Sequence, residues 1–318
     1  MNKKSLRYFV PCLAMALCSV AFTSCSDDDE GSVPTGPTTT FDGKQLVAVG
    51  NYTFRYDDRN RCDGVSYYND DFIDINYDNS TIYLDDDFDE LGGYKVKFNG
   101  KGYISNILAS WNFSEGSDRY NGSGSISFSY NGDRLVSQEM NSKEEYAYDG
   151  ERYSYSATGK TTLEWRNGDL VSGSMRYEEA EDDYESWMAD EFTVTYDETL
   201  ANPHKQFPYV LYYLLDEDYY VFGFVGMLGV GPEHLPASYE GEFSEEGQPW
   251  SESYSGNVSY GLNEDGTIDW ERLNGSTYRY DYYTAGGNDV YGRSASKMSS
   301  IERAKKVRDM FMKYRNRK

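Results

Sequence analysis

The chain has 318 residues, with 30 Lys/Arg against 54 Asp/Glu and a formal charge of −24. This length can bury a sizeable core in one large or two modest domains, and the acidity argues against nucleic acid as a partner because phosphate is repelled. Two histidines and four cysteines leave little for imidazole catalysis or zinc binding, whereas 32 tyrosines bring the aromatic share to 16%. We expect no cofactor and no metal.

Residues 1–24 have the features of a lipoprotein signal peptide. Three basic residues precede an apolar stretch over 8–22, which is too short to span a bilayer comfortably. A small residue followed by Cys25 resembles a lipobox, which implies that Cys25 becomes the lipid-bearing, palmitoylated N-terminus. Several acyl chains together hold a protein firmly at a membrane. The alternative from the residues alone is a short membrane anchor.

Residues 25–40 form an acidic tether in this interpretation. The run after the cysteine resembles the surface-export signal of Bacteroidota lipoproteins, and a solvated acidic linker is the alternative. We therefore expect a protein held in the outer membrane by a lipid anchor and exposed at the cell surface. The predicted export residues are Ser26, Asp27, Asp28, Asp29 and Glu30.

Residues 41–295 repeat a pattern of alternating aromatic and polar residues, then Asn or Asp with Gly, then an aliphatic residue. Alternation with period two places the aromatic residues on one face of a strand, and Asn-Gly or Asp-Gly accepts the positive φ angles of hairpin turns. The pattern predicts a mainly β domain, an antiparallel hairpin-repeat meander or rolled sheet. The recurrent aromatic residues are Tyr56, Tyr77, Phe98, Tyr130, Tyr148 and Trp165.

The unit Y-x-Y-[DN]-x-x-G-x-[LI] resembles the tyrosine–aspartate repeats of RHS-type surface proteins. Asn202-Pro203, the apolar run 207–215 and the Gly/Pro-rich run 229–236 resemble the later part of a Bacteroidota lipoprotein family known as domain of unknown function 4595. The likeness spans roughly 53–283. It implies a surface lipoprotein, and it implies no activity and no catalytic residues.

Three later segments depart from the strand pattern. Residues 207–215 fit a buried short helix or a core strand, because periodicity cannot decide so short a run. Residues 222–230 contain three glycines, which favours a loop packed under the sheet. Residues 296–318 read as a basic amphipathic helix with nine Lys/Arg and two acidic residues. That helix can pack on the sheet, bind a partner or lie on anionic lipid.

Few residues suggest catalysis or metal binding. Cys62 lies in a turn-like stretch without a nearby base, and we interpret His204 and His234 as structural because no nucleophile motif surrounds them. The acidic cluster 85–90 lacks the glycine and glutamate of an EF-hand loop, which leaves a looser carboxylate site or a solvated loop. The run 178–183 predicts another solvated loop.

Exposed aromatic side chains are the candidate binding residues, since Tyr and Trp stack on sugar rings and line protein interfaces. The alternative is that they form the core and the cross-strand ladder of the sheet. The candidates are Trp111, Trp165, Trp187, Trp250 and Trp270.

Three functions compete. The first is a non-catalytic module that binds a glycan, peptide or partner protein, and the second is a structural or assembly component without a small ligand. The third is a glycoside hydrolase, which needs two carboxyl groups converging in a cleft with one pKa raised by burial. With 54 acidic residues some pair always lies at a suitable separation, so the composition does not favour the third.

Overall fold

The fold is known from a computed structural model of the chain. The chain divides into Met1–Ser32 and Val33–Lys318, and every described residue belongs to the second unit. The structure describes residues 40–41, 43–67, 71–74, 77, 81–83, 94–148, 150–182, 184–215, 218–248, 251–284 and 308.

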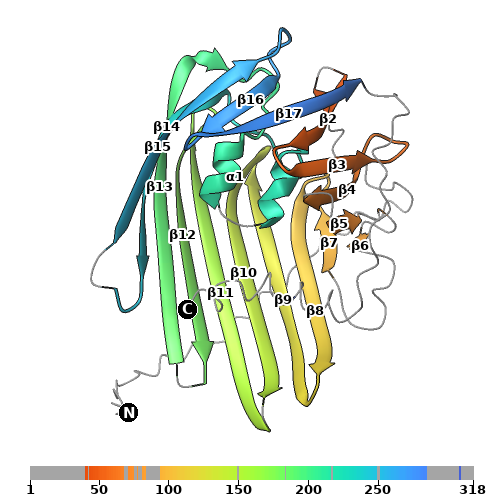
Figure 1. The fold of residues 1–318 in the computed structure, drawn as a ribbon, viewed down its shortest axis with the longest axis vertical. Helices are drawn as coiled ribbons and strands as arrows, with labels where there is room; N and C mark the ends of the chain where they lie inside the picture. Colours follow the sequence, from red (N-terminus) through yellow and green to blue (C-terminus); the bar gives the residue numbers. More distant parts are fainter. Residues whose placement is uncertain are drawn as a thin grey trace. The chain divides into compact units, whose positions relative to one another are not determined.

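Seventeen strands in the described ranges form one sheet, and paired strands are antiparallel (Figure 1). Each strand from β6 to β17 pairs with the next one in the chain, and β17 pairs with β2. From β2 to β5 the strands again pair in chain order. The predicted mainly β hairpin architecture is thus confirmed. The strands are β1 Thr40–Phe41, β2 Lys44–Val49, β3 Tyr52–Tyr56, β4 Cys62–Tyr67, β5 Asp71–Asp74, β6 Thr81–Tyr83, β7 Tyr94–Phe98, β8 Ile104–Glu115, β9 Asp118–Asn131, β10 Arg134–Tyr148, β11 Glu151–Arg166, β12 Asp169–Glu181, β13 Tyr184–Ala201, β14 His234–Glu245, β15 Glu252–Leu262, β16 Ile268–Leu273 and β17 Ser276–Thr284.

Hairpin turns occur at the predicted dipeptides Asn131-Gly132 and Asn167-Gly168, but not at Asp63-Gly64. Asn167 and Gly168 have φ angles of 53° and 95°, the double left-handed geometry that suits a tight two-residue turn. The predicted turn around Cys62 is wrong, because Cys62 begins β4 and Gly64 continues that strand. The chain reverses earlier, at Asn60, whose φ of 60° supplies the left-handed residue.

A repeated aromatic tether explains the sequence repeat. At six places among the described residues, the polar tip of a tyrosine or tryptophan donates to a backbone carbonyl of an earlier strand, over 2.6–3.0 Å. The donor–acceptor pairs are Tyr56–Leu46, Tyr77–Cys62, Tyr130–Ile104, Trp165–Leu135, Tyr196–Leu170 and Tyr282–Ile268. Each acceptor is an aliphatic residue or Cys62, near the start of its strand.

All six tethers share one register. The ladder between the two strands begins two residues after the acceptor and three before the donor, as Ser137 opposite Thr162 does beside Leu135 and Trp165. The strand that carries the acceptor also pairs with a second neighbour. In that second ladder the acceptor lies beside a register shift, where a bulge interrupts the pairing. The side-chain donor therefore satisfies a carbonyl that the ladder leaves out.

Tyr260 occupies the equivalent place on β15, yet its buried hydroxyl has no hydrogen-bond partner among the described residues. We predict that Tyr196→Phe lowers the free energy of unfolding by about 1–2 kcal/mol, because the Leu170 carbonyl loses its donor. Tyr260→Phe should change it by less than about 0.5 kcal/mol or stabilise, because no bond is lost. Equal losses in chemical denaturation of the two variants would contradict this account.

Glycines inside the strands make room for aromatic rings. In five directly opposed pairs a Cβ on the glycine would lie 2.0–2.5 Å from the aromatic side chain, so the ring lies across the glycine. Such pairs offset the entropic cost of glycine in a strand. The pairs are Trp111–Gly122, Phe192–Gly173, Tyr239–Gly256, Tyr254–Gly241 and Trp270–Gly261.

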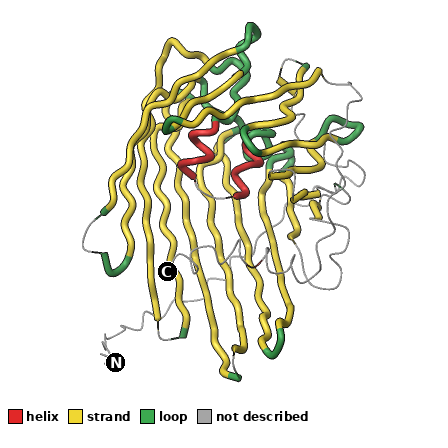
Figure 2. The backbone as a smooth tube through the Cα atoms, in the orientation of Figure 1, coloured by secondary structure: helices red, strands yellow, loops and turns green. Residues whose placement is uncertain are grey.

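The run 207–215 forms a helix, α1 (Tyr209–Leu215), followed by the 3-10 helix η2 (Asp218–Gly223) (Figure 2). The residues after η2 form the predicted packed loop, in which Phe224 and Met227 are buried. The ring of Tyr219 lies 5.6 Å from Phe128 on β9, whereas that of Phe224 lies 6.3 Å from Phe54 on β3. The helical segment thus fills the core between the long and the short strands.

Candidate functional site

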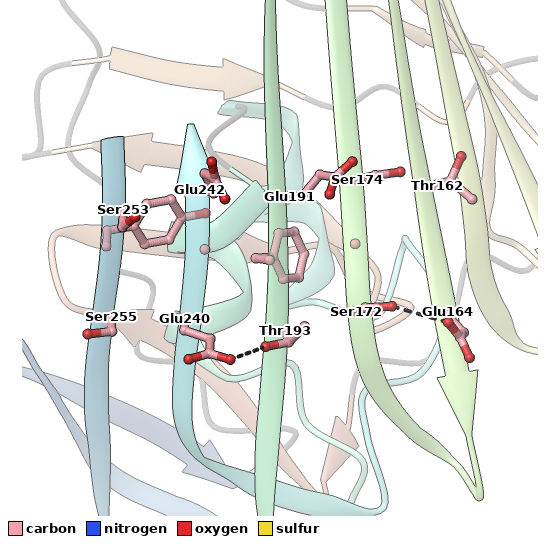
Figure 3. A pocket seen from close by; sticks show the side chains of 14 residues that line it. Thr162, Glu164, Ser172, Ser174, Glu191, Thr193, Glu240, Glu242, Ser253 and Ser255 are labelled. Carbon is pink, nitrogen blue, oxygen red and sulfur yellow. Dashed lines mark hydrogen bonds between the residues drawn. The ribbon is translucent and has the colours of Figure 1, made fainter. Parts of the chain in front are cut away.

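The face of the sheet opposite α1 carries a polar hollow of about 710 Å³ over β11–β15 (Figure 3). Strand alternation sends the aromatic residues toward the core and the residues between them to this outer face. Two cross-strand rows line the hollow. They are Glu164, Ser172, Thr193, Glu240 and Ser255, and beside them Thr162, Ser174, Glu191, Glu242 and Ser253.

Four carboxylates face this hollow. Glu164 is paired with Arg166 at 2.9 Å and accepts from Ser172 at 3.3 Å. Glu191 and Glu242 lie directly opposite each other on β13 and β14. Among the described residues no ion pair neutralises Glu191, Glu240 or Glu242, and like charges directly opposite destabilise a sheet. The hollow is therefore a site of excess negative charge with hydroxyl donors between the carboxylates.

The predicted tryptophans do not line this hollow. Trp111 is buried, and the other three described candidates are partly buried. Trp165 donates to the Leu135 carbonyl at 2.7 Å, and the Arg176 guanidinium lies 5.0 Å from the ring of Trp187. Trp270 lies across Gly261. Each ring thus has a local packing role, and Trp250 lies outside the described residues.

Other residues that the sequence singled out have structural partners. Cys62 is fully buried, and burial raises the pKa of its thiol to about 12, which disfavours the nucleophilic thiolate. His204 bonds the Asp265 carbonyl at 2.8 Å. The ring and the amide of His234 both contact Asp169 at 2.9 Å, which joins β12 to β14. Among the described residues, no serine or cysteine side chain forms a hydrogen bond with the ring of either histidine.

The acidic run 178–183 was predicted as a solvated loop, and this prediction is wrong for its first four residues. They belong to β12, where Glu179 accepts from Tyr155 and Ser186, and Glu181 accepts from Tyr146. Tyr155 on β11 and Tyr146 on β10 thus bind two carboxylates of this run.

Several predictions fall outside the described residues. They are the lipidation of Cys25, the export signal at Ser26–Glu30, the acidic cluster 85–90 and, except for Arg308, the basic helix 296–318. Within the described ranges, no group of three or more His, Cys, Asp or Glu is arranged to hold a metal ion. The helices found there lack the length and apolar character needed to cross a bilayer.

Sequence reasoning missed the hollow because it followed the aromatic half of each alternating strand. The other half carries Ser, Thr and Glu in the same period and was the available signal. Knowing that β11–β15 bring ten such residues into two adjacent rows requires the cross-strand register.

Comparison with known proteins yields little. No protein-family model matches the chain, and no curated protein matches it. A porin-like protein from Bacteroides vulgatus ATCC 8482 aligns over 75% of this chain and 98% of its own, with 16% identity and a TM-score of 0.48. A porin-like protein from Bacteroides uniformis ATCC 8492 aligns over 66% and 94%, with 11% identity and a TM-score of 0.25. Values this low establish neither a common family nor a common activity.

Proposed function

We propose that this protein is a lipid-anchored surface lipoprotein whose acidic hollow binds a cationic peptide segment of a partner protein without catalysis. The observation that carries the proposal is the opposition of Glu191 and Glu242 in a solvent-open, hydroxyl-lined hollow. A site that keeps like charges together at a cost to stability gains that energy back when a cation binds. Serine and threonine hydroxyls between the carboxylates offer further hydrogen bonds to a peptide.

The hydrolase alternative has less support. It needs a carboxyl in the cleft whose raised pKa keeps it protonated as a general acid. Among the described carboxyl groups, burial raises the pKa of Glu271, which lies in the core and bonds the amides of α1. Glu271 does not line the hollow.

The test compares two double variants of equal charge change. Glu191→Gln/Glu242→Gln should weaken binding of a lysine-rich peptide by roughly tenfold or more, measured by calorimetry, because the opposed carboxylates are its partners. Glu139→Gln/Glu178→Gln removes two exposed glutamates outside the hollow and should change the affinity by less than about twofold. Binding should weaken with salt, because the contacts are solvent-exposed.

Two results would contradict this role. One is equal weakening by both double variants, which would show only a general charge effect. The other is binding of a neutral oligosaccharide and not of the basic peptide, which would favour the glycan hypothesis. In the absence of peptide, Glu191→Gln should stabilise the protein by about 0.2–1 kcal/mol, because the opposed charges no longer repel.

The anchoring part of the proposal rests on Cys25 and has its own test. Cys25→Ala should move the protein from the membrane fraction to the soluble fraction, because the acyl chains provide the attachment. Retention of the variant in the membrane fraction would overturn the lipid anchor and leave the hollow unaffected.

A further inference from the structure

The core-facing side of β8–β11 contains a buried carboxylate among aromatic rings. Glu144 on β10 is 1% exposed. It lies in a cross-strand row with Trp111, Gly122 and Tyr155, on the face opposite the acidic hollow. An ionised carboxylate in such surroundings requires a cation and hydrogen-bond donors.

The first donor is on the sheet itself. The indole N–H of Trp111 donates to Glu144 Oε1 at 3.0 Å. It reaches across Gly122, where a Cβ would lie 2.4 Å from the indole ring. Because Gly122 has no side chain, the indole can lie across it, and the indole N–H then orients the carboxylate.

The cation comes from a residue 164 positions away. Arg308 donates through Nε to Glu144 Oε1 at 2.5 Å and through Nη2 to Oε2 at 3.0 Å. Its guanidinium carbon also lies 4.7 Å from the centre of the Tyr120 ring. Tyr120 is held in a row of stacked rings, between Phe113 at 4.8 Å and Tyr146 at 6.0 Å.

We propose that Glu144, Trp111 and Tyr120 form a binding site for the guanidinium group of an arginine, which Arg308 fills in cis and which a second arginine can fill in trans. A planar guanidinium can donate two parallel N–H bonds to an oriented carboxylate and make a cation–π contact with an aromatic ring at the same time. A lysine ammonium cannot make the two parallel bonds. Three β-strands build the receptor groups, whereas the occupant is one side chain from a distant part of the chain.

The site differs in chemistry from the acidic hollow. The hollow is open and holds several exposed carboxylates, whereas Glu144 is a buried carboxylate that binds the Trp111 N–H and an arginine lying over the Tyr120 ring. The hollow therefore selects positive charge, and the Glu144 site selects guanidinium over ammonium. The two proposals rest on different residues and can fail separately.

The test is rescue of Arg308→Ala in the full chain by arginine amide. The variant should melt below wild type, because Glu144 loses its cation, and arginine amide should raise its melting temperature in proportion to occupancy. We expect the variant to bind arginine amide at least tenfold more tightly than wild type, in which Arg308 competes. Lysine amide should produce less than a tenth of that gain.

The controls separate a specific site from general charge. Arg176→Ala removes an exposed arginine whose partner, Glu178, does not line the hollow, and this variant should gain no comparable affinity for arginine amide. Adding Glu144→Gln to Arg308→Ala should abolish the rescue, and adding Trp111→Phe should weaken it. If Arg308→Ala does not fold, Arg308→Lys keeps the charge without the fork and should still be stabilised by arginine amide more than wild type is.

The proposal is overturned if neither Arg308 variant gains affinity for arginine amide. It is also overturned if lysine amide rescues equally, or if the rescue survives Glu144→Gln.

Discussion

Replacing Glu271 with alanine is expected to lower the free energy of unfolding by about 3–5 kcal/mol. Glu271 is fully buried on β16 and accepts from the amides of Tyr209 and Val210 at 2.6 and 2.7 Å and from the Tyr280 hydroxyl at 2.9 Å. It thus joins the first turn of α1 to β16 and β17. Alanine would remove the acceptor of the Val210 amide and the Tyr280 hydroxyl and leave the Tyr209 amide with the Tyr280 hydroxyl alone. Urea unfolding monitored by circular dichroism measures the loss.

The same carboxyl should make stability depend on pH. Burial raises the pKa of Glu271 to about 7, despite the three hydrogen bonds that act to lower it. In the unfolded chain its pKa is near 4.5. The folded state therefore holds the proton more tightly, so the stabilisation is complete below about pH 4.5 and is lost as the pH rises through about 7, by at most roughly 3 kcal/mol.

Glu271→Gln isolates this effect from the other acidic residues. The glutamine has a similar shape and does not titrate, so the wild-type stability minus the variant stability should fall between about pH 4.5 and pH 7. The difference is measured by unfolding both proteins across that range. A difference that rises with pH would mean that the hydrogen bonds outweigh burial and that Glu271 is ionised in the core.

The second large effect is expected at Gly231. A Cβ there would lie 2.2 Å from the Gln206 carbonyl oxygen and 2.8 Å from that of Lys205, both backbone atoms. The amide of Gly231 donates to the same Lys205 carbonyl at 2.8 Å, so the two segments cannot separate without breaking this bond. Gly231→Ala should therefore cost about 3 kcal/mol or more, and it should lower the yield of folded protein.

Gly100→Ala is the matched control, because a Cβ there meets no atom within 4 Å and the backbone does not adopt a positive φ. It should change stability by less than about 0.5 kcal/mol. Thermal unfolding of both variants distinguishes close backbone approach from a general cost of replacing glycine. Similar losses in the two variants would contradict the packing of Gly231 against residues 205–206.

Much of the hairpin architecture follows from the sequence, because its signals are local. Alternation of aromatic and polar residues indicates which face of a strand is buried, and Asn-Gly favours chain reversal, as at Asn167 and Gly168. The departure at Asp63-Gly64 shows the limit of that rule. Asp-Gly is also compatible with a bulge inside a strand. Here β4 pairs with both β3 and β5, and this pairing makes the segment a strand.

Only the tertiary structure decided the rest, because it depends on pairing between residues far apart in the chain. The run 207–215 is apolar on all sides, so its period could not distinguish helix from strand. Packing against β3, β14 and β17, with the carboxylate of Glu271 at its first amides, made it a helix. The aromatic tethers, the opposition of Glu191 and Glu242, and the approach of Arg308 to Glu144 all require a cross-strand register or a contact across 164 positions. Local residue patterns carry no such information.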